Sequence, residues 1–134
     1  MRYLLDTDIC IHVARHRPRQ VLERLRSLEY GEVNISVITE FELTYGALKS
    51  ADPQGKLAQV ELVTRFAPPL PLDSSAVAAA ARIRLELERK GLRIGAYDTL
   101  IAAQALSSGL TLVTNNVREF GRVEGLRVEN WLEP

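Results

Sequence analysis

The stretch RYLLDTDICIHVARH, residues 2–16, contains the structural unit from which the remaining fold can be read. Residues 2–5 form a short apolar run that suits a strand, and the run ends at Asp6. Residues 7–16 then favour a helix, which closes at the basic, proline-containing stretch 15–19. The stretch therefore predicts a strand that passes directly into a helix.

The same alternation of short extended runs and longer helical ones continues along the chain. Residues 33–37 are a β-branched run, residues 68–72 suit an edge strand, and the ranges 110–114 and 126–128 complete the expected strands. Helices are expected over residues 20–28, 38–48, 57–66, 74–90 and 96–107. Ser74 or Ser75 is the expected N-cap of the longest helix, and Gly91 its stop. This order predicts an α/β fold with a mainly parallel central sheet of four to five strands.

Composition limits the possible functions. The chain has 134 residues and 46% hydrophobic residues, which predicts one domain over residues 1–134. Lys and Arg number 17, as do Asp and Glu, so any affinity for phosphate must be local. Cys10 is the only cysteine, which excludes an internal disulfide and predicts a reducing compartment. The sequence carries no export or membrane signal, and a cytoplasmic location is expected.

Polar side chains coincide with the ends of the expected strands. Asp6 follows the first strand, and Asn116 follows the strand over residues 110–114. Asp98 opens the helix over residues 96–107, and Glu42 lies one turn into the helix after the second strand, so all can reach one rim of the sheet. Carboxylates this close need a cation, and oxygen ligands without nearby Cys or His select Mg²⁺ or Mn²⁺.

Each acid also has a simpler structural interpretation. Asp6 and Asp98 both stand where a helix-capping Asp is expected. Glu40 and Glu42 are two residues apart and point to nearly opposite sides of a helix, so at most one enters the site. Gly46, one turn further on, leaves space beside Glu42 and slightly favours it.

Motifs spread over the whole chain resemble the PIN-domain toxins of the VapC family. They are LLDTDI at residues 4–9, SVITEFELTYGA at 36–47, IGAYDTLIAA at 94–103 and LVTNNVREF at 112–120. Each string alone is weakly specific, but the order and spacing of all of them are those of the family. The resemblance implies a three-layer PIN-like fold with helices on both sides of the sheet. It also implies a metal-dependent endoribonuclease.

The resemblance assigns roles to the candidate site residues. Asp6 and Asp98 would hold Mg²⁺ or Mn²⁺, and Glu42, rather than Glu40, would bind metal or orient the attacking water. Asn116 completes the catalytic set at a corner where many relatives carry an aspartate. The residues expected to support this set are Thr7, Asp8, Thr114 and Glu119, of which Glu119 is the nearest substitute for the missing acid.

The family also implies partners. Such proteins are toxins that cleave RNA, often structured RNA such as tRNA, and each is inhibited by a cognate antitoxin that enters the active-site groove. A homodimer is expected as well. Candidate contacts to RNA or to the antitoxin are Arg15, Arg17, Arg19 and Arg118, although any one of them could equally belong to a solvated basic surface.

Other functions share parts of this pattern. Asp6 and Asp8 resemble the nucleophile and acid of haloacid dehalogenase-like phosphatases, but Cys10 stands where Thr or Val is expected, and no suitably placed lysine follows. A receiver-type phosphoacceptor module would carry Lys-Pro where this chain has Asn115 and Asn116. A third alternative is a catalytically weak PIN fold that only binds RNA or a partner.

Overall fold

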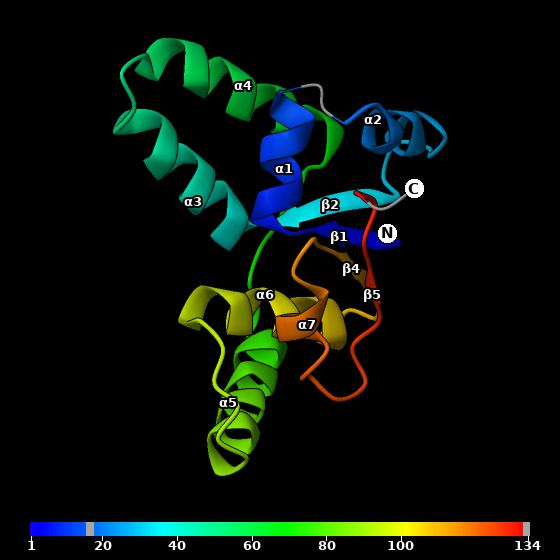
Figure 1. Ribbon diagram of the computed structural model, residues 1–134, viewed down its shortest axis with the longest axis vertical. Coiled ribbons are helices and arrows are strands. Elements are labelled where there is room, and N and C mark those ends of the chain that lie inside the picture. The colour runs from blue at the N-terminus through cyan, green and yellow to red at the C-terminus, as the bar shows by residue number, and fades with distance from the viewer. Residues whose placement is uncertain (16–17, 133–134) are drawn as a thin grey trace.

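The computed structural model describes residues 1–15 and 18–132, and its element order is that of an α/β fold (Figure 1). The strands are β1 Tyr3–Leu5, β2 Val33–Ser36, β3 Pro69–Leu70, β4 Thr111–Val113 and β5 Val128–Glu129. The helices are α1 Thr7–Ala14, α2 Arg19–Arg26, α3 Val37–Leu48, α4 Pro53–Phe66, α5 Ser74–Arg89, α6 Ala96–Ser107 and α7 Val117–Phe120. One five-stranded sheet has the order β3-β2-β1-β4-β5, and every neighbouring pair is parallel.

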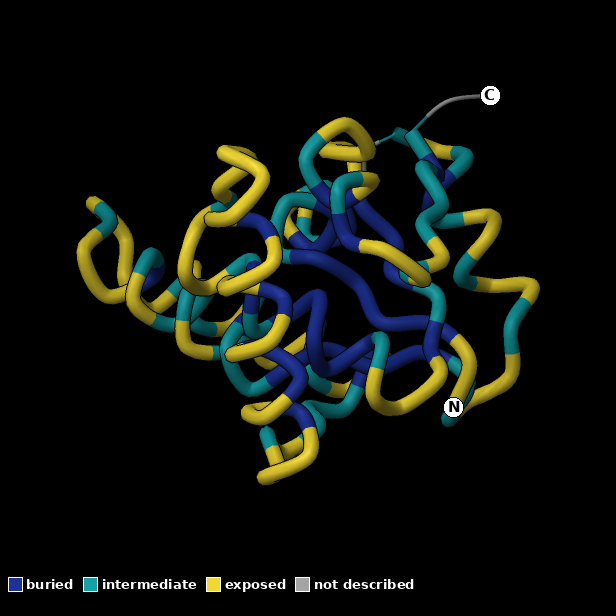
Figure 2. Tube along the Cα trace, turned by 90° about the horizontal axis from the view of Figure 1, so that it is seen from below, coloured by how far each residue is buried: buried dark blue, intermediate teal, exposed yellow. Residues whose placement is uncertain are grey.

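The sheet is the middle of three layers. Helices α1 to α4 cover one face, and α5 to α7 cover the other (Figure 1). Side chains of β1 alternate between two apolar clusters, because successive residues of a strand point to opposite faces: Tyr3 and Leu5 pack with Ile9 of α1, whereas Leu4 packs with Ile101 of α6. The strands consequently lie in the buried centre of Figure 2, and the exposed residues form the outer surface of the helices. The predicted three-layer α/β fold is confirmed.

Several element ends differ from the sequence predictions. Helix α4 begins at Pro53 rather than at residue 57, because Asp52 caps it by accepting from Gly55 N. The N-cap of α5 is Asp73, which accepts from Ala76 N, and not Ser74 or Ser75. The last strand, expected over residues 126–128, is found two residues later as β5. Helix α7 was not predicted.

The strand order changes direction at the centre of the sheet. Strand β1 has β2 on one side and β4 on the other, with Leu5 paired in register to both Ile35 and Val113. In parallel α/β sheets, ligands bind in the crevice beyond the carboxyl ends of the strands at such a point. The fold therefore directs attention to the residues that follow β1 and β4.

None of the helices over residues 1–15 and 18–132 combines the length and apolar character that crossing a bilayer requires.

Candidate active site

Asp6 lies at the centre of the crevice between β1 and β4. It is only 6% exposed and is the N-cap of α1. Its Oδ1 accepts from Thr7 N at 2.8 Å, and its Oδ2 accepts from Thr114 Oγ1 at 2.9 Å. Thr114 directly follows β4, so its hydroxyl joins the ends of the two central strands. These bonds fix the Asp6 carboxyl in one orientation.

The electrostatic environment of Asp6 disfavours its charge. Burial, and then the charge of Asp8, raise the pKa of Asp6 to about 7, although the hydrogen bonds from Thr114 and Thr7 act in the opposite direction. No cation of the described residues forms an ion pair with Asp6. A capping residue alone does not require such burial beside another acid, so the capping role predicted as the simpler alternative is real but incomplete.

Glu42 reaches the same site from α3. Thr7 Oγ1 donates to Glu42 Oε1 at 2.7 Å and lies 3.1 Å from Thr39 Oγ1. Thr7 thus connects α1 to α3 through its hydroxyl while its backbone N–H binds Asp6. Glu42, rather than Glu40, is the acid of α3 that this network includes.

Asp98 enters from the first turn of α6. The N-cap of this helix is Gly95, so Asp98 does not open the helix as a capping residue. Burial, and then the charges of Glu119 and Glu42, raise the pKa of Asp98 to about 6. Acids from α3, α6 and α7 are therefore close enough to affect one another's protonation.

The corner after β4 combines Asn116 and Glu119. Asn116 is the N-cap of α7: its side chain accepts from Glu119 N at 3.4 Å, and its amide donates to Glu119 Oε2. Glu119 Oε1 accepts from Gly95 N at 3.2 Å, one turn before Asp98. The structure therefore places the Glu119 carboxylate beside Asp98, and the Asn116 amide holds that carboxylate in position.

Asp8 adds a further carboxylate to the first turn of α1. Its Oδ2 accepts from Asn115 N at 3.2 Å, whereas its buried Oδ1 has no hydrogen-bond partner among the described residues. Burial is the main cause of a raised pKa at Asp8. Asp8 thus ties α1 to the loop after β4 and leaves one buried oxygen without a partner.

Comparison with known proteins identifies the family of the chain. Residues 3–126 match the PIN domain family. The chain is 44% identical over 131 residues to the tRNA(fMet)-specific endonuclease VapC of Shigella flexneri and 43% identical to that of Salmonella typhimurium, covering 98% of both chains in each case. The crystal structure of DNA-bound VapBC from Salmonella typhimurium superposes with a TM-score of 0.92 at 43% identity, again over 98% of each chain. The chain belongs to the VapC family of PIN-domain ribonuclease toxins.

Membership of the VapC family decides between the functions that the sequence left open. The phosphatase and receiver interpretations of Asp6 and Asp8 are set aside, because the full-length relatives are ribonucleases. The predicted ribonuclease activity and toxin family are confirmed.

The donor chemistry of this VapC site fits a hard divalent cation. Its ligands are carboxylate oxygens, and the only cysteine, Cys10, is buried with a raised pKa. No group of three His, Cys, Asp or Glu side chains among residues 1–15 and 18–132 is already gathered closely enough to hold a metal ion. Mg²⁺ does not need such a set, because it usually binds one or two carboxylates and takes its remaining ligands from water and substrate phosphate. The orphaned oxygen of Asp8 and the raised pKa values of Asp6 and Asp98 also fit a site that can bind a divalent cation.

The arginines predicted to contact RNA or the antitoxin lie in different surroundings. Arg19 is highly exposed and pairs with Glu23 at 3.1 Å within α2. Arg118 is exposed on α7, close to the acidic site in sequence. Arg15 lines a groove of about 210 Å³ between α1, α3 and α4, and this groove also includes Glu42 and Gly46. Arg17 lies outside the described residues.

That groove is a feature that the sequence indicated only through Gly46. A Cβ atom at Gly46 would meet nothing within 4 Å, so the helix surface beside Glu42 is open, as predicted. The groove is lined mainly by apolar side chains of three helices, including Ile11, Leu43 and Val60. It connects the acidic site to an apolar surface of the VapC fold.

Proposed function

We propose that this VapC protein hydrolyses RNA phosphodiester bonds with a Mg²⁺ or Mn²⁺ ion bound by Asp6 and Asp98. The observation that carries the proposal is the convergence of carboxylates from α1, α3, α6 and α7 at the edge of β1 and β4, with raised pKa values at Asp6 and Asp98. A bound divalent cation would supply charge stabilisation of the phosphate and a lower pKa for an attacking water. Among the proposed catalytic residues are Asp6, Glu42, Asp98 and Asn116.

The residues of the chain perform distinct tasks in this scheme. Thr7 and Thr114 orient the two oxygens of Asp6. Glu42 Oε1 accepts a hydrogen bond from the Thr7 hydroxyl, which leaves Oε2 to accept a proton from the attacking water. Asn116 acts by holding Glu119, whose carboxylate supplies the fourth acidic group.

We infer that the substrate is tRNA. Relatives covering 98% of this chain, from Shigella flexneri and Salmonella typhimurium, are named tRNA(fMet)-specific endonucleases, and the identity of about 44% extends across the chain. Initiator tRNA is therefore the first substrate to test.

An antitoxin is the proposed inhibitory partner. The Salmonella typhimurium relative was solved as VapBC. In this chain the groove of about 210 Å³ offers apolar walls and ends at Thr7 and Glu42. An amphipathic segment of an antitoxin fits such a groove, and an arginine at its end would pair with the carboxylates.

A homodimer is also proposed. Phe41, Tyr45 and Tyr97 are about half exposed, and the Phe41 ring is stacked on Tyr45 at a centroid distance of 6.4 Å and edge-on to Tyr97 at 5.7 Å. Exposed aromatic clusters of this kind are typical of protein interfaces. Sedimentation of the wild type and of Phe41→Ser/Tyr45→Ser tests this surface, and unchanged dimers in the variant would exclude it.

Substitution of Asp98 tests the catalytic proposal. Asn keeps the size and polarity of Asp but contributes no charge to a metal, so Asp98→Asn should fold normally, bind Mn²⁺ weakly and cleave tRNA at least about a hundredfold more slowly. Glu40→Gln removes the same charge from the acid of α3 outside the network and is the matched control. An Asp98→Asn variant that cleaves at the wild-type rate would exclude Asp98 from metal binding.

A further inference from the structure

A second groove lies outside the acidic site, between α5 and the segment that follows α7. It encloses about 350 Å³ and is larger than the groove beside Glu42. Its cationic side chains are Arg82 and Arg89 on α5, Lys90 at the C-cap of that helix and Arg122 on the facing segment, and its carboxylates are Glu86 and Glu124. Cations therefore stand on both walls and outnumber the acids.

These cations are available to an external anion. Arg82, Arg89 and Lys90 are exposed, and neither they nor Arg122 form an ion pair within the described part of the chain. The other face of α5 behaves differently, because Arg84 pairs there with Glu88 at 3.3 Å. The arginines of α5 on the groove side therefore form no ion pair among the described residues, whereas the arginine on the other face does.

Residues 93–95 lie between this groove and the acidic site. Arg122 Nη1 donates to Arg93 O at 3.1 Å, which anchors the groove wall to the turn before α6. Two residues later, Gly95 N donates to Glu119 Oε1 at 3.2 Å within the active site. Residues 93–95 thus contact Arg122 of the groove and Glu119 of the acidic site, and so connect the two.

RNA binding requires such a positive surface somewhere on this protein. Arg and Lys only equal Asp and Glu in number, and the cleavage site itself is a concentration of carboxylates that repels phosphate. Of the basic residues before α3, Arg19 is already paired with Glu23. The α5 groove carries four cations that form no ion pair among the described residues, whereas the groove beside Glu42 carries two, Arg15 and Lys56.

We propose that the α5 groove binds the sugar-phosphate backbone of the RNA substrate at a distance from the bond that is cleaved. The charged walls favour a polyanion over an antitoxin segment, for which the apolar groove beside Glu42 is the better fit. The inference rests on the proposed RNA hydrolysis and assigns its remote binding surface. Arg82 and Arg89 act in binding and take no part in the chemical step.

Binding of fluorescently labelled, unfractionated bacterial tRNA in EDTA tests the groove without cleavage. Arg82→Gln/Arg89→Gln should weaken binding at least about tenfold at about 100 mM salt. The plot of the logarithm of the association constant against the logarithm of the salt concentration should become less steep by about two. Arg84→Gln on the other face of α5 is the matched control and should change affinity less than about twofold. Melting curves of both variants should match the wild type, because these side chains are exposed.

Cleavage kinetics in Mg²⁺ complete the test. The double variant should raise KM for tRNA and leave kcat unchanged. Equal tRNA affinity of the double variant and Arg84→Gln, a loss confined to kcat, or a loss of antitoxin binding alone would each overturn the proposal. Asp98→Asn separates the two hypotheses: it should bind tRNA in EDTA at least as tightly as the wild type, and its full activity would refute the proposed mechanism without altering the binding result.

Discussion

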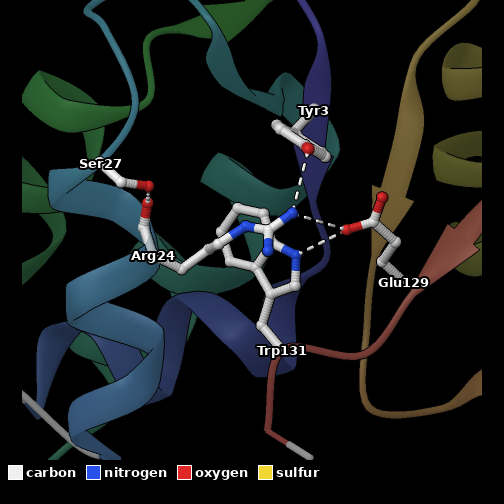
Figure 3. A network of polar contacts seen from close by, with 5 residues as sticks. All are labelled: Tyr3, Arg24, Ser27, Glu129 and Trp131. Atoms are coloured by element: carbon white, nitrogen blue, oxygen red, sulfur yellow. Dashed lines mark hydrogen bonds and ion pairs between the residues drawn. The ribbon is translucent and has the colours of Figure 1, made fainter. Parts of the chain in front are cut away.

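Two polar networks surround the central strand, and they differ in how their charges are satisfied. At Tyr3, the guanidinium of Arg24 lies 3.3 Å from both Tyr3 Oη and Glu129 Oε1 and 5.4 Å from the Trp131 ring, and Trp131 Nε1 donates to Glu129 at 3.0 Å (Figure 3). Beyond the other end of the strand, Asp6 is surrounded by acids. The first network neutralises itself, whereas the acids of the second form no ion pair with a cation of the described residues.

The Tyr3 network is therefore expected to contribute to stability, and the acidic site to catalysis. The Tyr3 network joins β1, α2 and β5, which lie far apart in sequence, and so fastens the C-terminal segment to the sheet. The acidic site concentrates carboxylates whose mutual repulsion opposes folding, and the proposed cation would relieve that repulsion. We expect substitutions in the two networks to have opposite consequences.

The largest effect on stability is expected for Trp131→Ala. Trp131 is 6% exposed and packs edge-on against Tyr3 with a centroid distance of 5.1 Å. Its loss leaves a cavity and should lower the free energy of unfolding by about 3–5 kcal/mol in urea titrations. Trp131→Phe keeps a ring and should lose much less. A fall in kcat of the folded variant would contradict the separation of the two networks.

Asp6→Asn should stabilise the metal-free protein at alkaline pH. Folding raises the pKa of Asp6 from 3.8 to about 7, so the folded state binds the proton more tightly than the unfolded state. Its contribution to stability is present below about pH 4 and is lost as pH rises to about 7, for a total of a few kcal/mol. Wild-type melting temperature in EDTA should therefore fall from pH 5 to pH 8.

The Asn variant carries no titratable group at this position, so its melting temperature should change less over the same range. Asp73→Asn, at the exposed cap of α5, is the control and should follow the wild-type profile. A wild-type protein that becomes more stable on deprotonation would show that the Asp6 site is not electrostatically strained.

The sequence predicts one of these networks better than the other. Asp6 and Asp98 could be found because strand ends and helix starts are local features, and α6 was predicted at its observed bounds of 96–107 because its apolar pattern is long. The Tyr3 network could not be found, since its hydrogen bonds join residues up to 105 positions apart. Helix α7 has four residues, which is too short for a periodic signal.

The same limit applies to the basic surfaces. The arginines before and within α2 could be predicted as a basic surface because they are close together in sequence. The α5 groove combines one face of a helix with Arg122, which becomes its neighbour only through the fold. Similarly, the role of Glu119 depends on its contact with Gly95, 24 residues earlier, and spacing alone does not reveal it.

Glu119→Gln should weaken the acidic site by an intermediate amount. Removal of its charge leaves Asp98 with a lower pKa and one fewer carboxylate for the cation. Mn²⁺ affinity and tRNA cleavage should fall by about 10- to 100-fold. Calorimetric titration with Mn²⁺ measures the first quantity, and Glu40→Gln is the control from α3. Unchanged metal affinity would place Glu119 outside the proposed metal environment.

The smallest effect is expected for Asn116→Asp. Asp caps a helix as well as Asn does, so α7 should persist, and stability in Mg²⁺ should stay within about 0.5 kcal/mol of the wild type. The new carboxylate replaces a donor to Glu119 with a like charge, which should lower the melting temperature in EDTA and tighten Mn²⁺ binding a few-fold, since affinity rises with ligand charge. Asn116→Ala removes the cap and the donor without adding charge, and it should weaken Mn²⁺ binding. If both variants bind Mn²⁺ like the wild type, Asn116 only caps α7 and has no influence on metal binding.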